Sequence, residues 1–173
     1  RASAVASAGV YNGRGQLGDG GASGRGGPVA GRLPTGRNAT SVSAGCRHTC
    51  AVLDNGVAYC WGQNSVGQLG DGSQVDRLVP VAVSLPSGRT ATSVDAGGWH
   101  TCAVLDDASL YCWGNNGDGQ LGDGTTPQST TPAAVSLPSG RTATSVSITK
   151  YHTCAIPDHA SPYLLSRIHT VRP

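Results

Sequence analysis

Short apolar runs alternate with glycine-rich turns along most of the chain. After Pro80, four such runs are rich in Val, Thr, Tyr and Trp, at residues 81–83, 91–96, 101–105 and 110–113. These residue types favour β-strands, turn residues separate the runs, and no window shows an apolar period of 3.6 residues. The pattern predicts an all-β chain with four strands in each structural unit.

The hairpin between His48 and Trp61 is apolar on both faces. If residues 54–56 form a three-residue loop, alternation along the strands defines two sets of side chains. One set contains Cys50, Val52, Ala58 and Cys60, and the other contains Ala51, Leu53, Val57, Tyr59 and Trp61. Because both faces must be covered, we expect the sheets to stack face to face.

Several motifs recur with a spacing of 52 residues. His-Thr-Cys begins at His48, His100 and His152; Leu-Pro at Leu33, Leu85 and Leu137; Gly-Gln-Leu-Gly-Asp-Gly at Gly15, Gly67 and Gly119; and Tyr-Cys-Trp-Gly at Tyr59 and Tyr111. A period of this length is typical of repeat architectures. It divides the chain into an incomplete first unit (1–20), two repeats (21–72 and 73–124), a partial third repeat (125–155) and an irregular tail (156–173).

Both ends depart from the repeat. Ala8 and Gly9 stand where later units have Cys and Trp, and Ile148-Thr149 replaces the Ala-Gly that precedes the other histidine motifs. After Cys154, the expected hairpin contains Pro157 and Pro162, and Leu164 stands at the position of the second cysteine. Proline interrupts strand pairing, so the pattern predicts that the tail does not complete a unit. Because the chain begins with Arg1 rather than Met, it is either a processed protein or a fragment, and we expect a fragment.

The segment AGGWHTCAVLDDASLYCWGNNGDGQLGDGT resembles the repeat of the regulator of chromosome condensation (RCC1) family. The hallmarks of that repeat are A-G-x-x-H-(T/S), a hairpin, W-G-x-N and G-Q-L-G-x-G. The likeness extends over residues 13 to 153. It implies a fragment of a β-propeller with about three four-stranded blades of 52 residues each.

The cysteines at Cys50, Cys60, Cys102 and Cys112 are candidates for two disulfides within hairpins. A three-residue loop places Cys50 opposite Cys60, at a Cα separation of about 4.5 Å that a disulfide accepts. A two-residue turn would instead direct the two sulfur atoms to opposite faces. Cys102 and Cys112 keep the same spacing, with Ala108 in place of the loop glycine. The alternative is small buried cysteine in a reducing cell.

The sequence predicts no metal, no cofactor and no catalytic residue. Cys46, His48 and Cys50 offer ligand atoms, but no Cys-x-x-Cys occurs and their spacing does not close a zinc site. A nucleophilic Cys-His pair is usually single, whereas His-Thr-Cys occurs three times, which favours a framework role. The Gly-Gln-Leu-Gly-Asp-Gly segments lack the ligand pattern of a calcium loop and the lysine of a phosphate loop. We interpret them as turns whose leucines, Leu17, Leu69 and Leu121, fill the gap between blades.

The charge and the cysteine content limit the class of binding partner and the cellular compartment that we expect for this chain. Twelve basic and ten acidic residues give a net charge of +2 without a basic run, which disfavours nucleic acid. No apolar run reaches the ~20 residues of a membrane span. Six cysteines favour an extracellular or cell-surface location, and the nucleus or cytoplasm is the alternative.

The most favoured function is a non-catalytic scaffold that binds a protein through blade loops. Equivalent positions before each histidine hold Arg47, Trp99 and Tyr151, and residues 74–77 differ from residues 126–129, so these variable positions are the predicted binding residues. Family resemblance implies two alternatives: guanine-nucleotide exchange on a small GTPase, or ultraviolet-B sensing through Trp61, Trp99 and Trp113. Uncovered blade edges also predict self-association.

Overall fold

The computed structural model describes residues 6–7 and 11–158, and every regular element in these ranges is a β-strand. The strands are β1 (Ala6–Ser7), β2 (Val29–Ala30), β3 (Ala39–Ala44), β4 (His48–Leu53), β5 (Ala58–Gly62), β6 (Arg77–Ala82), β7 (Ala91–Ala96), β8 (His100–Leu105), β9 (Leu110–Gly114), β10 (Ser129–Ala134), β11 (Ala143–Ile148) and β12 (Thr153–Pro157). All strand pairs are antiparallel. The all-β prediction is confirmed.

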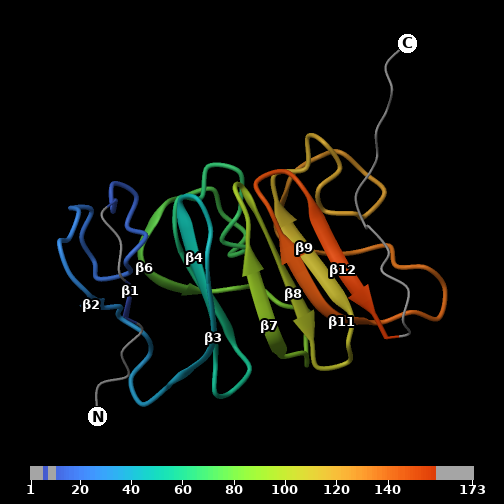
Figure 1. Ribbon diagram of the computed structural model, residues 1–173, viewed down its shortest axis with the longest axis horizontal. Helices are drawn as coiled ribbons and strands as arrows, with labels where there is room; N and C mark the ends of the chain where they lie inside the picture. Colours follow the sequence, from blue (N-terminus) through green and yellow to red (C-terminus); the bar gives the residue numbers. More distant parts are fainter. Residues whose placement is uncertain (1–5, 8–10, 159–173) are drawn as a thin grey trace.

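The strands form two complete four-stranded sheets between two partial ones. The first blade is β3-β4-β5-β6 and the second is β7-β8-β9-β10, while among the described strands β1 pairs with β2 alone and β11 with β12 alone. Figure 1 shows these sheets side by side in chain order. Strands β3, β7 and β11 contact one another across successive sheets, so they form the inner edge, and β6 and β10 lie at the outer edge. This arrangement is a partial β-propeller.

Apolar side chains from facing sheets build the core between the blades. One cluster joins Cys50, Val52, Ala58 and Cys60 of the first blade to Val94, Ala96, Ala103 and Trp113 of the second. The opposite face of the first blade contributes Ala51, Leu53 and Trp61 to another cluster. The two faces expected from alternation are therefore confirmed. Because each face is covered by a neighbouring unit, blade stability depends on stacking.

The fourth strand of each blade differs from the sequence prediction. A strand at residues 81–83 was grouped with the three strands that follow it, but β6 begins earlier, at Arg77, and pairs with β5 of the preceding hairpin. Each sheet thus spans residues 39–82 or 91–134, out of phase with the 52-residue units divided at residues 72 and 124. Local strand propensity locates the strand but does not specify its partner across the intervening loop.

Each end of the stack presents an uncovered face within the described residues. Val42 on β3 is 48% exposed, whereas its counterpart Val94 is 5% exposed in the core between the blades. At the other end, Ile156 on β12 is 57% exposed, whereas Val104 is 3% exposed. Of the predicted departures from the repeat, Ala8, Gly9, Pro162 and Leu164 lie outside the described residues, and Pro157 ends β12.

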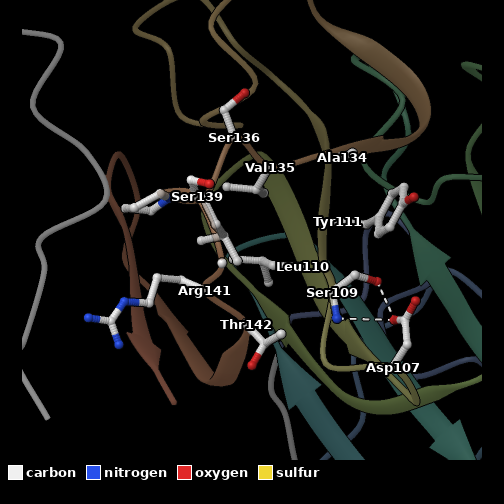
Figure 2. A pocket seen from close by; sticks show the side chains of 13 residues that line it. Asp107, Ser109, Leu110, Tyr111, Ala134, Val135, Ser136, Ser139, Arg141 and Thr142 are labelled. Carbon is white, nitrogen blue, oxygen red and sulfur yellow. Dashed lines mark hydrogen bonds between the residues drawn. The ribbon is translucent and has the colours of Figure 1, made fainter. Parts of the chain in front are cut away.

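The hairpin loops have the predicted three-residue form. The Leu53 amide donates to the Val57 carbonyl at 3.0 Å, and Gly56 has a φ of 73°. In the second blade Ala108 adopts the same left-handed conformation, with a φ of 60°, and it is the one non-glycine residue with positive φ in the described ranges. Figure 2 shows this turn, where the amide and hydroxyl of Ser109 donate to Asp107. The turn borders a hollow covered by the loop that follows β10.

Replacing Ala108 by Gly should raise the free energy of unfolding by about 1 kcal/mol, because an L side chain is strained in this conformation. Urea unfolding of the two proteins measures the difference. The matched variant Gly56→Ala should be destabilised by more, since its Cβ would lie 2.5 Å from the Cβ of Thr90. Equal stability of Ala108→Gly and the parent chain would contradict the assignment of strain.

Candidate functional site

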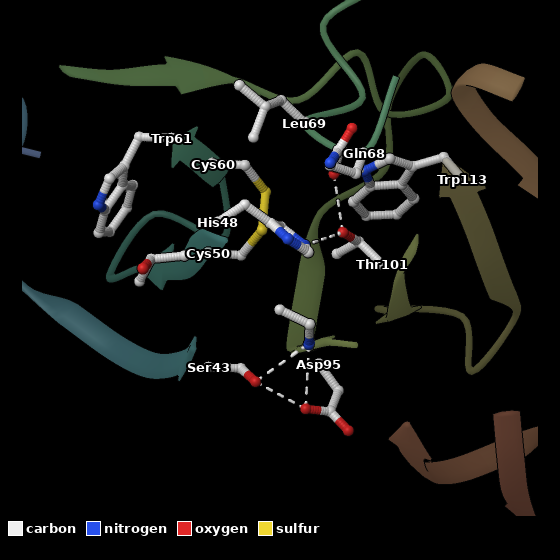
Figure 3. Close-up of a disulfide and its surroundings, with 12 residues drawn as sticks. Ser43, His48, Cys50, Cys60, Trp61, Gln68, Leu69, Asp95, Thr101 and Trp113 are labelled. Atoms are coloured by element: carbon white, nitrogen blue, oxygen red, sulfur yellow. Dashed lines mark hydrogen bonds between the residues drawn. A yellow bond between two sulfur atoms is a disulfide. The ribbon is translucent and has the colours of Figure 1, made fainter. Parts of the chain in front are cut away.

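The repeated histidine joins neighbouring blades. His48 Nε2 lies 2.8 Å from Thr101 Oγ1 on the next blade, and Thr101 donates its hydroxyl proton to the carbonyl of Gln68 at 2.8 Å. The indole nitrogen of Trp113 donates to the same carbonyl at 3.0 Å. Figure 3 shows this chain of contacts beside the first disulfide. The contacts recur one repeat later from His100 through Thr153 to Gln120.

These contacts fix the protonation of the histidine. Because the Thr101 hydroxyl donates to Gln68, it accepts from His48, so the proton of the neutral imidazole is on Nε2. Burial, and secondarily the charge of His100, lower the pKa of His48 to about 3. Burial also lowers the pKa of His100 to about 4, although Asp95 opposes this shift. Both histidines are neutral framework groups at physiological pH.

The cysteines of each hairpin lie opposite each other and are bonded in the structure. Cys50 pairs with Cys60 and Cys102 with Cys112, in the register that the three-residue loop predicted. All four are fully buried. Since His48 contacts Thr101 rather than a thiol, the arrangement does not provide a Cys-His nucleophile. Within the described ranges, no three His, Cys, Asp or Glu side chains gather to hold a metal ion.

The glycine-rich exit turns pack between blades, as predicted. Leu69 is fully buried and belongs to the core between the two blades. A buried asparagine that the sequence analysis did not single out organises the turn: Asn64 accepts from the Leu69 amide at 2.9 Å and donates to the Ser73 carbonyl at 3.0 Å. Its counterparts, Asn12 and Asn116, make equivalent bonds. Their spacing of 52 residues was the available signal.

The loops before the histidines stack backbone against backbone. The Cys46 amide donates to the Gly97 carbonyl at 3.1 Å, and the Gly98 amide to the Thr149 carbonyl at 3.4 Å. A Cβ on Gly45 would lie 2.3 Å from the Gly97 carbonyl oxygen, so only glycine fits. Thr149 stands in the third loop at the position that Gly45 and Gly97 hold in the first two. Within the described residues, no further loop packs against Thr149, so a side chain fits there.

We define the inner rim as residues 45–47, 97–99 and 149–151. The loops enclose a shallow hollow, lined by Gly45, Cys46, Gly97, Gly98, Thr149 and Lys150. Beside it, the guanidinium of Arg47 lies 5.4 Å from the centre of the Trp99 ring, and Lys150 Nζ lies 4.9 Å from the centre of the Tyr151 ring. The contact with Tyr151 raises the pKa of Lys150, which is therefore a cation at neutral pH.

The structure brings the predicted binding residues to one end of the sheets. Arg47 and Trp99 are half-buried and in contact, and Tyr151 is 49% exposed beside Lys150. Residues 74–77 and 126–129 lie at the same end but nearer the outer edge, because they lead into β6 and β10. Lys150 was not singled out from the sequence, although it is the one lysine in the chain.

Family models give a specific match. The regulator of chromosome condensation (RCC1) repeat matches residues 55–104 and 107–156, and a second model of the same repeat matches residues 39–68 and 91–120. These ranges include both complete hairpins and the exit turns. The match covers more than half of the chain.

Two curated relatives are similar over different lengths. The ultraviolet-B receptor UVR8 of Arabidopsis thaliana is 39% identical over 85 residues, which cover 49% of this chain and 19% of the receptor. The human E3 ubiquitin-protein ligase HERC2 is 32% identical over 144 residues, or 80% of this chain and 3% of the ligase. The chain thus spans a small part of each relative.

Solved structures share the fold. Human WBSCR16 superposes with a TM-score of 0.75 at 19% identity, covering 86% of this chain and 39% of that protein. Prp20p of Saccharomyces cerevisiae, described with its binding to Gsp1p and histones, gives a TM-score of 0.72 at 20% identity, covering 87% of this chain and 39% of Prp20p.

In the ranges that the structure describes, no helix is long and apolar enough to cross a membrane.

Proposed function

Because the chain belongs to the regulator of chromosome condensation (RCC1) repeat family, we propose that it is a non-catalytic scaffold that binds a protein partner through the inner rim. One observation carries this proposal. Equivalent framework positions present Arg47, Trp99 and Tyr151 at one end of the stack, beside a hollow. Arg, Trp and Tyr are the side chains that dominate binding energy in protein interfaces.

The rigidity of the surrounding loops supports the proposal. Arg47 and Trp99 follow segments that are held by backbone contacts between loops, and each directly precedes a buried histidine. A side chain on such a rigid backbone loses less entropy when it binds. Residues 74–77 are less favoured than the inner rim, because Asp76 is ion-paired with Arg14 and Arg77 with Asp71.

Affinity capture with matched triple variants tests the proposed function. The variant Arg47→Ala, Trp99→Ala, Tyr151→Ala should lose a partner that the parent chain retains. The control variant replaces Arg37, Arg89 and Arg141 by Ala; these residues lie at the opposite end of the blades, where each pairs with the aspartate that directly follows β4, β8 or β12. The control should retain the partner. Retention by both variants, or loss from both, would contradict binding at the inner rim.

Two alternative functions have weaker support than the protein-binding scaffold. Guanine-nucleotide exchange on a small GTPase rests on the family resemblance alone. Ultraviolet-B sensing has one specific observation in its favour, the stacking of Arg47 on Trp99, together with the similarity to UVR8. Exposure of the purified chain to ultraviolet-B light should then change its assembly state or its tryptophan fluorescence reversibly. The scaffold proposal expects no such change.

We propose an extracellular or cell-surface location, with the nucleus or cytoplasm as the alternative. The support is the buried disulfide of each complete hairpin, because such bonds persist in oxidising compartments. Counting thiols in protein from its native source distinguishes the two locations.

Self-association through the open faces also remains a prediction. Val42 and Ile156 expose positions that are covered by neighbouring sheets elsewhere in the chain. Sedimentation velocity over a concentration series should show assemblies, and Val42→Asp should reduce them because a charge disfavours burial of this face. The matched surface variant Val75→Asp should not reduce them, since Val75 lies in an exposed loop. A monomer at all concentrations would contradict this prediction.

A further inference from the structure

Most basic side chains of the described blades are already paired with carboxylates. Ion pairs connect Arg14, Arg25, Arg37, Arg77, Arg89 and Arg141 to aspartates. All ten acidic residues of the chain are aspartates between Asp19 and Asp158, so all of them lie in the described range. None of these aspartates forms an ion pair with Arg47 or Lys150.

Within the described residues, the two cations of the inner rim therefore have no ion-pair partner. Asp95, on strand β7 that leads to the rim, forms no ion pair with either cation and is held between blades: it accepts from the Ser43 hydroxyl at 2.6 Å and from the Ile148 amide at 2.7 Å. Among the residues that the structure describes, the Arg47 guanidinium donates one long hydrogen bond, 3.5 Å to the side-chain oxygen of Gln63. Arg47 and Lys150 lie close enough for the charge of Arg47 to oppose protonation of Lys150.

The aromatic rings add a second kind of recognition. Trp99 is covered on one face by Arg47, and Tyr151 is approached by Lys150, so each cation lies beside an apolar surface. A guanidinium stacked on a ring can still donate in its plane to a carboxylate, whereas an ammonium acts as a point charge. Two cations are too few for the many phosphate contacts that binding of a nucleic acid backbone requires.

We propose that the inner rim recognises an acidic segment of a partner protein, with carboxylates on Arg47 and Lys150 and neighbouring side chains on Trp99 and Tyr151. The inference rests on the proposed function and specifies the chemistry of the partner. It requires a positive local potential at Trp99, a property that can be measured without the partner.

Fluorescence quenching measures this potential directly. Trp61 and Trp113 are fully buried, so Trp99 is the tryptophan that ions in solution reach. Iodide should quench its emission roughly threefold more efficiently than caesium, after each quenching constant is divided by that of free N-acetyltryptophanamide with the same ion, because a unit charge about 6 Å away in ~0.1 M salt raises the local anion concentration and lowers the local cation concentration by somewhat less than twofold each. Lys150→Gln and Arg47→Gln should each lower the ratio, and Arg89→Gln at the opposite end should leave it unchanged. A ratio of one or less in the parent chain would overturn the inference.

A peptide titration then tests recognition. A short oligoglutamate peptide should protect Trp99 from iodide, and the protection should weaken in Lys150→Gln and at high salt. Oligolysine of equal length is the control peptide. Stronger protection by oligolysine, by a single-stranded oligonucleotide or by anionic vesicles would overturn the assignment of an acidic protein segment. Failure of these assays together with partner loss in the triple-alanine variant would reject the acidic chemistry while leaving the proposed function intact.

Discussion

Lowering the pH from 7 to 4 should reduce the free energy of unfolding by about 3 kcal/mol for each of His48 and His100. Burial lowers the pKa of His48 to about 3 and that of His100 to about 4, whereas unfolded histidine titrates near 6.5. Below 6.5 the unfolded chain therefore binds protons that the folded chain does not. The contribution of the two histidines to the free energy of unfolding is therefore fully present above pH 6.5 and is lost as the pH falls towards 4. Urea unfolding at a series of pH values measures this loss.

Glutamine variants separate the two buried histidines from other acid effects. His48→Gln can keep a donor to Thr101 but does not titrate, so it should remove about half of the pH dependence. His152→Gln is the comparison variant: His152 is exposed at the equivalent position, and its charge contributes to the lowered pKa of His100, so this variant should change the dependence less than His48→Gln does. Protonation of carboxylates affects the free energy of unfolding at lower pH than protonation of the histidines. For example, hydrogen bonds from the Gly21 amide and Arg25 lower the pKa of Asp19 below 3.8. Equal stability at pH 6.5 and pH 4 would refute the neutral framework role.

Reduction of both disulfides should lower the free energy of unfolding by about 2 to 3 kcal/mol per bond. Each bond closes a short loop with a separation of 10 residues, and its loss restores conformational entropy to the unfolded chain. Urea unfolding with and without a reductant measures the effect. The variants Cys50→Ala with Cys60→Ala, and Cys102→Ala with Cys112→Ala, should each reproduce one part of it.

The remaining cysteines supply the control. Cys46 and Cys154 are free in the structure, so serine at these positions should leave the response to reductant unchanged. Denatured, unreduced protein should show two free thiols from its six cysteines. Six free thiols in protein from its native source, or a reductant effect below about 1 kcal/mol, would contradict paired cysteines and favour an intracellular location.

Local sequence information was sufficient for the hairpins. The length of the loop at residues 54–56 determines the register, and the register determines that Cys50 faces Cys60 and which residues share each face. The repeat then extends this result to the second blade, where Ala108 adopts the strained conformation that the loop requires. The framework role of His48 was also predictable, because a residue that recurs in each unit serves the fold.

Contacts between units were beyond the reach of the sequence. The period of 52 residues does not show that β6 pairs with β5 across the loop at residues 63–76. It also does not show that the Asn64 side chain accepts a hydrogen bond from the buried amide of Leu69. The stacking of Arg47 on Trp99 joins different units, and Lys150 forms no ion pair with any aspartate of the described blades. The pairing of β6 and the turn at Asn64 depend on how the loop folds within one blade, whereas the stacking of Arg47 on Trp99 depends on how neighbouring blades pack.

The bond between His48 and Thr101 joins residues 53 apart, as does the bond between His100 and Thr153. A recombination that removed residues 57–108 would bring Thr153 to the place of Thr101 and Gln120 to the place of Gln68. His48 would then find the same partners that it has now. Whole repeats can be gained or lost in evolution without inventing a new interface, so the number of blades can vary among descendants of one gene while every remaining junction is preserved.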